Sequence, residues 1–181
     1  MRTLFLIIAL SFAINSLFSQ TNYYTETKTF YEDGYTYQVN TDIDIELYNK
    51  DNKWVNVEQK YKFTGELYFM SESDARPIYK DSWLMNRSLL YSIIESGFTK
   101  EQKEFLCKDD YDIIITLYIN SETGKVDDVS FTFDEFSAFK YIPVSVFREI
   151  ELKIKERLTF AVTDEGKKLN YIFYWDYYKF N

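Results

Sequence analysis

The strongest constraint on this chain is a two-residue alternation of apolar and polar side chains, repeated in segments that end at turn-forming residues. In 111–119 apolar residues occupy every second position, and after a turn at 120–125 the pattern returns in 129–133. Successive side chains of a strand point to opposite faces of a sheet, so the pattern predicts antiparallel strands with one buried face. That face comprises Tyr111, Ile113, Ile115, Leu117, Ile119, Val129, Phe131 and Phe133.

The same alternation fills an earlier part of the chain. Apolar residues alternate from Tyr35 to Leu47 and again from Val55 to Phe69, on either side of a polar turn at 49–53. These segments predict a long hairpin, in which Gly65 marks a bulge or bend. A further short strand is expected at 29–31.

Helical periodicity appears in three other segments. Asp81 and Ser82 are suited to cap a helix that runs to about residue 96. Thr99 and Gln102 form a capping-box pattern for a short helix that ends near residue 107. Pro143 fits the first turn of a third helix, whose apolar stripe is Phe147, Ile150, Ile154 and Leu158.

The third helix also contains two pairs of opposite charge at a spacing of four, Glu149–Lys153 and Glu151–Lys155. We expect both pairs on its solvent-exposed face. A strand is then expected at 159–162, a turn at 163–167 and a returning strand at 169–178. This order of elements predicts an α+β fold, an antiparallel sheet with helices packed on one face.

The N-terminus has the features of an export signal. Arg2 precedes an apolar run over 4–14 and a polar exit at Asn15 and Ser16. The run is shorter than the roughly 20 residues that a membrane-spanning helix needs, which favours a secretory signal peptide. We expect cleavage after Ser19; the alternative is an uncleaved anchor.

The predicted organisation is a signal peptide at 1–19, an N-terminal β-hairpin with helices at 20–108 and a ββαββ unit at 109–181, forming one compact body.

Composition limits the function. Cleavage removes Arg2, so 20 basic and 29 acidic residues remain and the formal charge becomes −9. An acidic chain argues against nucleic acid or an anionic membrane as partner. The chain has no histidine and a single cysteine, which excludes a Ser–His–Asp hydrolase and makes zinc binding unfavourable. Cys107 is expected to be buried and inert. We therefore predict no catalytic residue, no cofactor and no metal, and no enzymatic activity.

Three groups of acidic residues are candidate sites. Asp42, Asp44 and Glu46 are spaced by two and could bind Ca²⁺ from one strand face, although a solvated face explains them better. The other groups are Asp109, Asp110 and Asp112, and Asp127 and Asp128, the last two expected on opposite faces. None has the pattern of a calcium-binding loop, and no spacing singles out a carboxylate pair for glycoside hydrolysis.

Aromatic residues line the last predicted strand. Tyr171, Phe173, Trp175 and Tyr177 share one face and could stack on sugar rings or on a peptide, although burial in the core is the commoner reason for such a row. The sequon Asn86-Arg-Ser88 lies in a predicted helix, so we expect no glycan there.

The C-terminal part resembles the C-terminal domain of TonB-like periplasmic proteins. The resemblance rests on the apolar strand and Gly-Lys turn of 115–129, on a second Gly-Lys turn within 160–171, and on Phe180 at the end. It implies a protein-binding edge strand. A TonB-type energy transducer needs a membrane anchor and a Pro-rich spacer, and we expect neither; Lys168 also replaces the usual proline. The whole chain resembles small uncharacterised secreted families of Bacteroides-type bacteria.

These observations favour an exported, periplasmic or extracellular, non-enzymatic protein that binds a protein or is associated with the envelope. The alternative is a module that binds carbohydrate or a small ligand with its C-terminal aromatics, and a small carboxylate-dependent hydrolase is a third hypothesis. The expected partner is an unknown protein or glycan of the cell envelope, without nucleic acid and without a stable membrane span after cleavage.

Overall fold

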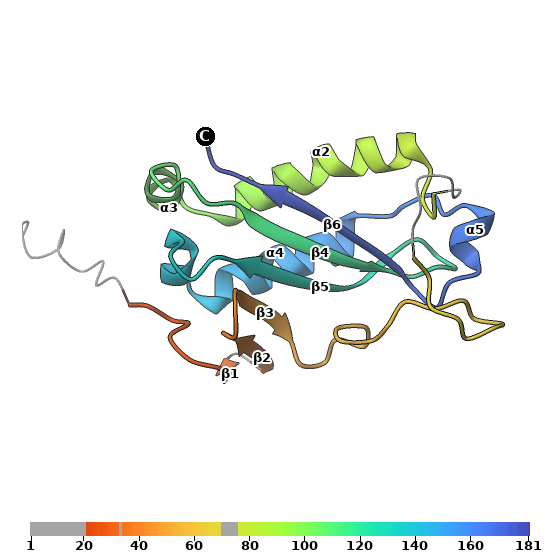
Figure 1. The fold of residues 1–181 in the computed structure, drawn as a ribbon. Helices are drawn as coiled ribbons and strands as arrows, with labels where there is room; N and C mark the ends of the chain where they lie inside the picture. Colours follow the sequence, from red (N-terminus) through yellow and green to blue (C-terminus); the bar gives the residue numbers. More distant parts are fainter. Residues whose placement is uncertain (1–20, 33, 70–75) are drawn as a thin grey trace, which may run out of the picture.

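The computed structural model describes residues 21–32, 34–69 and 76–181, which form one antiparallel sheet with helices on one face (Figure 1). Among these residues the sheet has six strands in the order β1-β2-β3-β5-β4-β6. The predicted α+β class is therefore confirmed. The strands are β1 Lys28–Glu32, β2 Tyr35–Asn40, β3 Ile45–Asn49, β4 Ile113–Ile119, β5 Val126–Phe133 and β6 Ile172–Tyr178.

The helices follow the predicted order, with small differences at their ends. They are α2 Lys80–Gly97, α3 Lys100–Leu106, the 3-10 helix η1 Ala138–Tyr141, α4 Val144–Arg157 and the single turn α5 Asp164–Lys167. The capping box of α3 is confirmed, because the Thr99 hydroxyl accepts from the Gln102 N–H at 3.2 Å and the Gln102 side chain accepts from the Thr99 N–H at 2.8 Å. The predicted cap of α2 is wrong, since the helix starts after Tyr79 without a side-chain cap.

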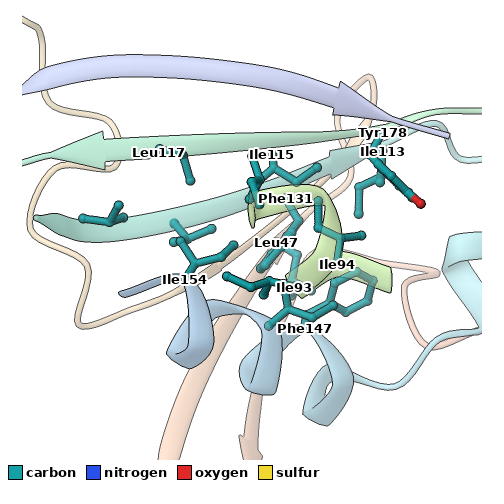
Figure 2. Packing of buried hydrophobic residues seen from close by; sticks show 14 of the residues in the cluster. Leu47, Ile93, Ile94, Ile113, Ile115, Leu117, Phe131, Phe147, Ile154 and Tyr178 are labelled. Atoms are coloured by element: carbon teal, nitrogen blue, oxygen red, sulfur yellow. The ribbon is translucent and has the colours of Figure 1, made fainter. Parts of the chain in front are cut away.

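The core lies between the sheet and the helices α2 and α4 (Figure 2). Gly97 permits their close approach, since a Cβ there would lie 2.4 Å from a side-chain carbon of Ile150. The buried residues that meet in this layer include Leu47 of β3, Ile113, Ile115 and Leu117 of β4, Phe131 of β5, Ile93 and Ile94 of α2, and Phe147 and Ile154 of α4.

The long hairpin predicted over 35–69 is wrong. The chain turns at 41–44, so that β2 pairs with β3, and β3 pairs with β5. Val39 and Ile45 are six positions apart, an even number, so the alternation stays in phase across the turn while Ile43 within it is 87% exposed. Segment 55–69 contributes only the isolated bridges Lys60–Leu67 and Tyr61–Leu169 among the described residues.

The second predicted hairpin is also wrong. Residues 159–162 make single bridges at Thr159 and Val162 in place of a strand, and 163–167 forms α5, whose first turn is capped by Thr163. Phe160 is held instead against the first Gly-Lys turn, where its N–H donates to the Gly124 carbonyl at 2.8 Å. Gly124 has φ +70°, and a Cβ there would lie 1.9 Å from the Phe160 carbonyl oxygen. β6 therefore pairs with β4, and the C-terminal part is a ββαβ unit.

Glu151 is buried, whereas the sequence predicted an exposed ion pair. It follows Phe147 by four residues, which places it on the inner face of α4. The hydroxyl of Tyr37 donates to its carboxylate, and Arg148 donates to it at 3.0 Å. Burial, and then the neighbouring Glu151 carboxylate, raise the pKa of Tyr37, so its hydroxyl remains the donor. This cluster attaches the strands β1–β3 to α4.

Candidate functional site along the free edge of β6

β6 forms one edge of the sheet, because its only strand partner among the described residues is β4. Six of its seven residues are aromatic or β-branched, in the sequence Ile-Phe-Tyr-Trp-Asp-Tyr-Tyr, which suits a pleated surface. An edge strand leaves every second main-chain N–H and C=O without a ladder partner. The edge can therefore offer a partner only those N–H and C=O groups that point away from β4.

The register assigns those directions. The Asn120 N–H donates to the Lys125 carbonyl at 2.8 Å, toward β5, so alternation directs the main-chain groups of the odd-numbered β4 residues toward β6. Their partners on β6 have even numbers, from Ile172 to Tyr178. The main-chain groups of Phe173, Trp175 and Tyr177 consequently point away from the sheet. The Tyr177 carbonyl, which accepts from the hydroxyl of Tyr91 on α2 at 3.3 Å, agrees with this assignment.

The same three odd-numbered side chains form an exposed aromatic row. Phe173, Trp175 and Tyr177 are 43%, 52% and 53% exposed, on the face of the sheet opposite the helices. The Trp175 and Tyr177 rings lie 6.1 Å apart and are tilted by 37°, so they are not coplanar. Tyr171 leaves the row: it is buried, and its ring stacks at 4.8 Å on Trp54.

The even-numbered side chains of β6 meet α2, which runs beside the strand in the same direction (Figure 1). A strand rises about 6.6 Å in two residues and a helix about 6 Å in four, so the two repeats stay nearly in step. They produce three successive contacts at this spacing. These are Trp83 with Tyr174, with ring centroids 3.6 Å apart, Arg87 with Asp176, and Tyr91 with Tyr178, with centroids 5.1 Å apart.

The central contact is a two-point ion pair. Arg87 donates from Nε to Asp176 at 2.6 Å and from Nη2 at 3.2 Å, and the Tyr91 hydroxyl donates to the same carboxylate at 3.1 Å. The hydrogen bond to Asp176 raises the pKa of Arg87, and burial raises the pKa of Tyr91. Asp176 also accepts from the Tyr177 N–H at 3.0 Å. The C-terminal end of the edge is therefore occupied by the protein's own side chains.

The N-terminal half of the edge is free of main-chain hydrogen bonds from the residues that the structure describes. No other described residue hydrogen-bonds the outward main-chain groups of Phe173 and Trp175. Beside them runs a groove of about 940 Å³, within the range of ligand sites. Its lining comprises Gln59, Tyr68, Phe69, Arg76, Pro77, Ile78, Lys80, Trp83, Arg87 and residues 172–177.

The groove is basic although the chain is acidic. Its lining contains three cationic side chains and one carboxylate, Asp176, which Arg87 already pairs. Arg76 and Lys80 are exposed, and neither forms an ion pair with any other residue that the structure describes. α2 begins at Lys80, before the contact of Trp83 with Tyr174, so both cations lie toward the start of β6 (Figure 1).

The opposite end of β6 is acidic. A small hollow of about 210 Å³ there is lined by Asp44, Asp112, Asp134 and Tyr177, together with apolar and threonine side chains. Within the described ranges, no three His, Cys, Asp or Glu side chains are grouped so that they could hold a metal ion. Lys179, which follows β6 at this end, is paired with Asp110, so Asp44, Asp112 and Asp134 leave this end acidic, whereas the Phe173 end is basic.

The predicted acidic row is not a strand face. Asp42 and Asp44 lie in the turn between β2 and β3, and only Glu46 belongs to a strand, where it accepts from Asn40 at 3.2 Å. In the second group, Asp109 accepts from the Ser137 hydroxyl at 3.1 Å and Asp110 pairs with an exposed lysine. Glu46, Asp109 and Asp110 are thus engaged by side chains of the protein itself.

Asp127 and Asp128 do not point to opposite faces, because the register shifts between Tyr118 and Ile119 on the paired strand β4. Both side chains reach Trp54: Asp127 accepts from its indole N–H at 3.2 Å and Asp128 from its main-chain N–H at 2.8 Å. Burial raises the pKa of Asp128. The pair anchors the segment after β3.

Two further expectations can be compared with the structure. Cys107 is exposed, not buried as predicted, because α3 turns only one apolar residue, Leu106, fully into the core at its end. Asn86 of the sequon is buried and donates to the carbonyls of Ser82 and Thr159 at 2.9 and 3.0 Å. None of the helices in the described ranges is long and apolar enough to cross a bilayer.

The fold and the groove define a class: a small α+β protein with a six-stranded antiparallel sheet, one helical layer and an open aromatic edge. Residues 20–175 match the model of a family described as "Domain of unknown function (DUF5043)", and the chain belongs to this family. The crystal structure of a DUF5043 family protein from Bacteroides uniformis ATCC 8492 is similar, with 36% identity, a TM-score of 0.79 and coverage of 88% of each chain. A comparison with curated proteins gave no match.

Proposed function

We propose that this protein is an exported, non-enzymatic module that binds an extended segment of a partner protein as an added strand at the edge of β6. The observation behind this proposal is the open edge at Phe173 and Trp175, whose outward main-chain groups face a groove with no other described hydrogen-bond partner. Strand addition uses such an edge for affinity and neighbouring side-chain pockets for specificity.

The edge offers enough interactions for a specific complex. Two outward residues provide two N–H donors and two carbonyl acceptors, and each hydrogen bond contributes about 1 kcal/mol net. The aromatic side chains of Trp175 and Tyr177 add apolar surface that a bound segment would cover, at roughly 25 cal/mol per Å². Aromatic residues of this kind are enriched in the centres of protein interfaces.

A binding role without catalysis agrees with the chemistry of the groove. Its one carboxylate, Asp176, is held by Arg87 and Tyr91, and the chain contains no histidine. A carboxylate-dependent hydrolase would need two carboxylates that converge in the groove. The glycan alternative needs an exposed coplanar ring pair, whereas Trp175 and Tyr177 are tilted by 37°.

Export is part of the proposal. The leader pattern at 1–19 supports it, and the family match starts at Gln20, the first residue after the predicted cleavage site. N-terminal sequencing of the protein from its native cells should give a start near Gln20. A start at Met1 would contradict export by cleavage.

Photo-cross-linking in the native envelope tests the binding role. With p-benzoylphenylalanine at position 175, we expect a discrete cross-linked protein whose attached peptide maps to a single extended segment. The same group at position 136, where Phe136 is 68% exposed and outside the groove, is the control and should give no such product. Absence of a protein partner, together with clear binding to a glycan array, would refute the proposal.

A further inference from the structure

The direction of a strand added to β6 would determine which of its ends meets which charge. Every strand pair in the described sheet is antiparallel. An added segment that continues this pattern runs from the Tyr177 end of β6 toward the Phe173 end. Its N-terminal half then lies near the acidic hollow and its C-terminal end lies between Arg76 and Lys80.

The charges at the two ends favour this direction. The cations at the start of β6 have no described ion-pair partner, while Asp44, Asp112 and Asp134 gather at its other end. A parallel segment would bring its terminal carboxylate toward the three aspartates. Complementary charge fixes orientation and suppresses the wrong one.

We propose that the groove selects an extended peptide segment that lies antiparallel to β6 and presents a carboxylate at its C-terminal end to Arg76 and Lys80. This inference rests on the proposed function and specifies its ligand. The carboxylate belongs either to the chain terminus or to an Asp or Glu side chain among the last residues. Both sources provide the planar anion that a guanidinium group binds with two hydrogen bonds.

The test starts from random octapeptides displayed with free C-termini and selected on the purified protein. Selected sequences are synthesised with a fluorescein label in three forms: a free C-terminus, a C-terminal amide, and an amide with glutamate at the penultimate position. Fluorescence anisotropy measures their affinities at low and at physiological salt. We expect the uncharged amide to bind about tenfold more weakly, and the difference to shrink as salt rises.

Substitutions test whether Arg76 and Lys80 cause the preference for a peptide carboxylate. Arg76→Gln combined with Lys80→Gln should equalise the three peptide forms. The matched control, Lys50→Gln combined with Lys108→Gln, removes two exposed charges outside the groove and should leave the preference intact. A benzophenone at the N-terminus of the peptide should cross-link near Tyr177, and one at its C-terminus near Ile78.

The outcomes separate this inference from the proposed function. Equal binding of all three forms, with loss of binding in Trp175→Pro, would overturn the carboxylate preference and leave strand addition intact. Cross-links at exchanged positions would overturn the antiparallel orientation. Peptides whose binding is unaffected by Trp175→Pro would overturn both, and so would a selection that yields no binding peptide.

Discussion

β1 and β6 form the two edges of the sheet, and they differ in length, composition and surroundings. β1 has five residues, begins with Lys28, and places that ammonium group 4.9 Å from the ring of Phe30. β6 has seven residues, and its single charged residue, Asp176, is buried and paired. A short edge with a lysine resists pairing with other chains, whereas a longer aromatic edge invites it.

The contrast supports β6 as the edge at which the proposed partner segment is added. A protein that needed only to stay monomeric would protect both edges alike, because each is a template for aggregation. Here the cationic side chains near β6 stand beside the open main-chain groups and leave them accessible.

The largest effect is expected where β1–β3 are attached to α4. Glu151→Ala leaves Arg148 and Tyr37 without their buried partner, so the free energy of unfolding should fall by about 3–5 kcal/mol. Urea denaturation measures this loss. Glu149→Ala on the exposed face of the same helix is the control and should change it by less than about 0.5 kcal/mol. Equal effects would show that the buried cluster is not an anchor.

At the β6 edge, Trp175→Pro should weaken binding of a selected octapeptide about 100-fold, through loss of one N–H donor and a central aromatic side chain. The fold should survive, because the missing N–H points away from β4 and proline is tolerated at such positions. Lys28→Pro, at the first residue of β1, should leave binding unchanged. A comparable loss in both variants, measured by anisotropy, would end the distinction between the edges.

Loss of the Arg87–Asp176 ion pair, which holds α2 against β6, should lower the free energy of unfolding less than loss of Glu151. Asp176→Asn removes the charge that receives Arg87, and we expect a loss of about 1–2 kcal/mol in thermal or urea unfolding. Lys179→Gln breaks the exposed pair with Asp110 and should cost less than about 0.5 kcal/mol. Similar losses of unfolding free energy in the two variants would mean that the ion pair of Asp176 does not hold α2 against β6.

The smallest effect concerns pH at the start of β6. Burial raises the pKa of Tyr171 to about 12, so the folded state favours the neutral phenol. The stability that this raised pKa contributes is present below the unfolded-state pKa near 10 and is lost as pH rises toward 12. Tyr171→Phe also loses the hydrogen bond to the Val57 carbonyl, which costs about 1 kcal/mol at pH 8. The gap to the wild type should narrow at pH 11; urea curves that keep a constant gap would contradict this.

Local sequence signals predicted the elements whose contacts are local. The strands β4 and β5, the capping box at Thr99 and the buried stripe of α4 were all placed correctly, because period and capping residues determine them. Failures arose where a turn preserved the period, as at Ile43, or where tertiary contact replaced pairing, as at Phe160. The sequence pattern places Glu151 on the exposed face of α4, because its buried partner Tyr37 is distant in sequence.

The candidate site was predicted only in part. The alternation in 171–177 indicated that Phe173, Trp175 and Tyr177 share one face, but it favoured burial of that face, and Tyr171 was expected in the same row. Its position at an edge depends on the strand order, which the alternation does not contain. Arg76 precedes α2 and Lys80 is its first residue, so no periodic pattern connected these two cations with β6 residues almost a hundred positions later.

The alignment of α2 with β6 depends on two axial repeats, one helical and one of the strand, that are nearly equal in length. Each step of four helical residues falls short of two strand residues by about 0.6 Å, so the mismatch reaches roughly 2 Å after three steps. The contacts at Trp83, Arg87 and Tyr91 span two such steps, and β6 ends at the third contact, Tyr178. One residue inserted between Trp83 and Arg87 would turn the rest of the helix by about 100° and displace both later contacts. The three contacts between α2 and β6 therefore depend on the near equality of the helical repeat and the strand repeat.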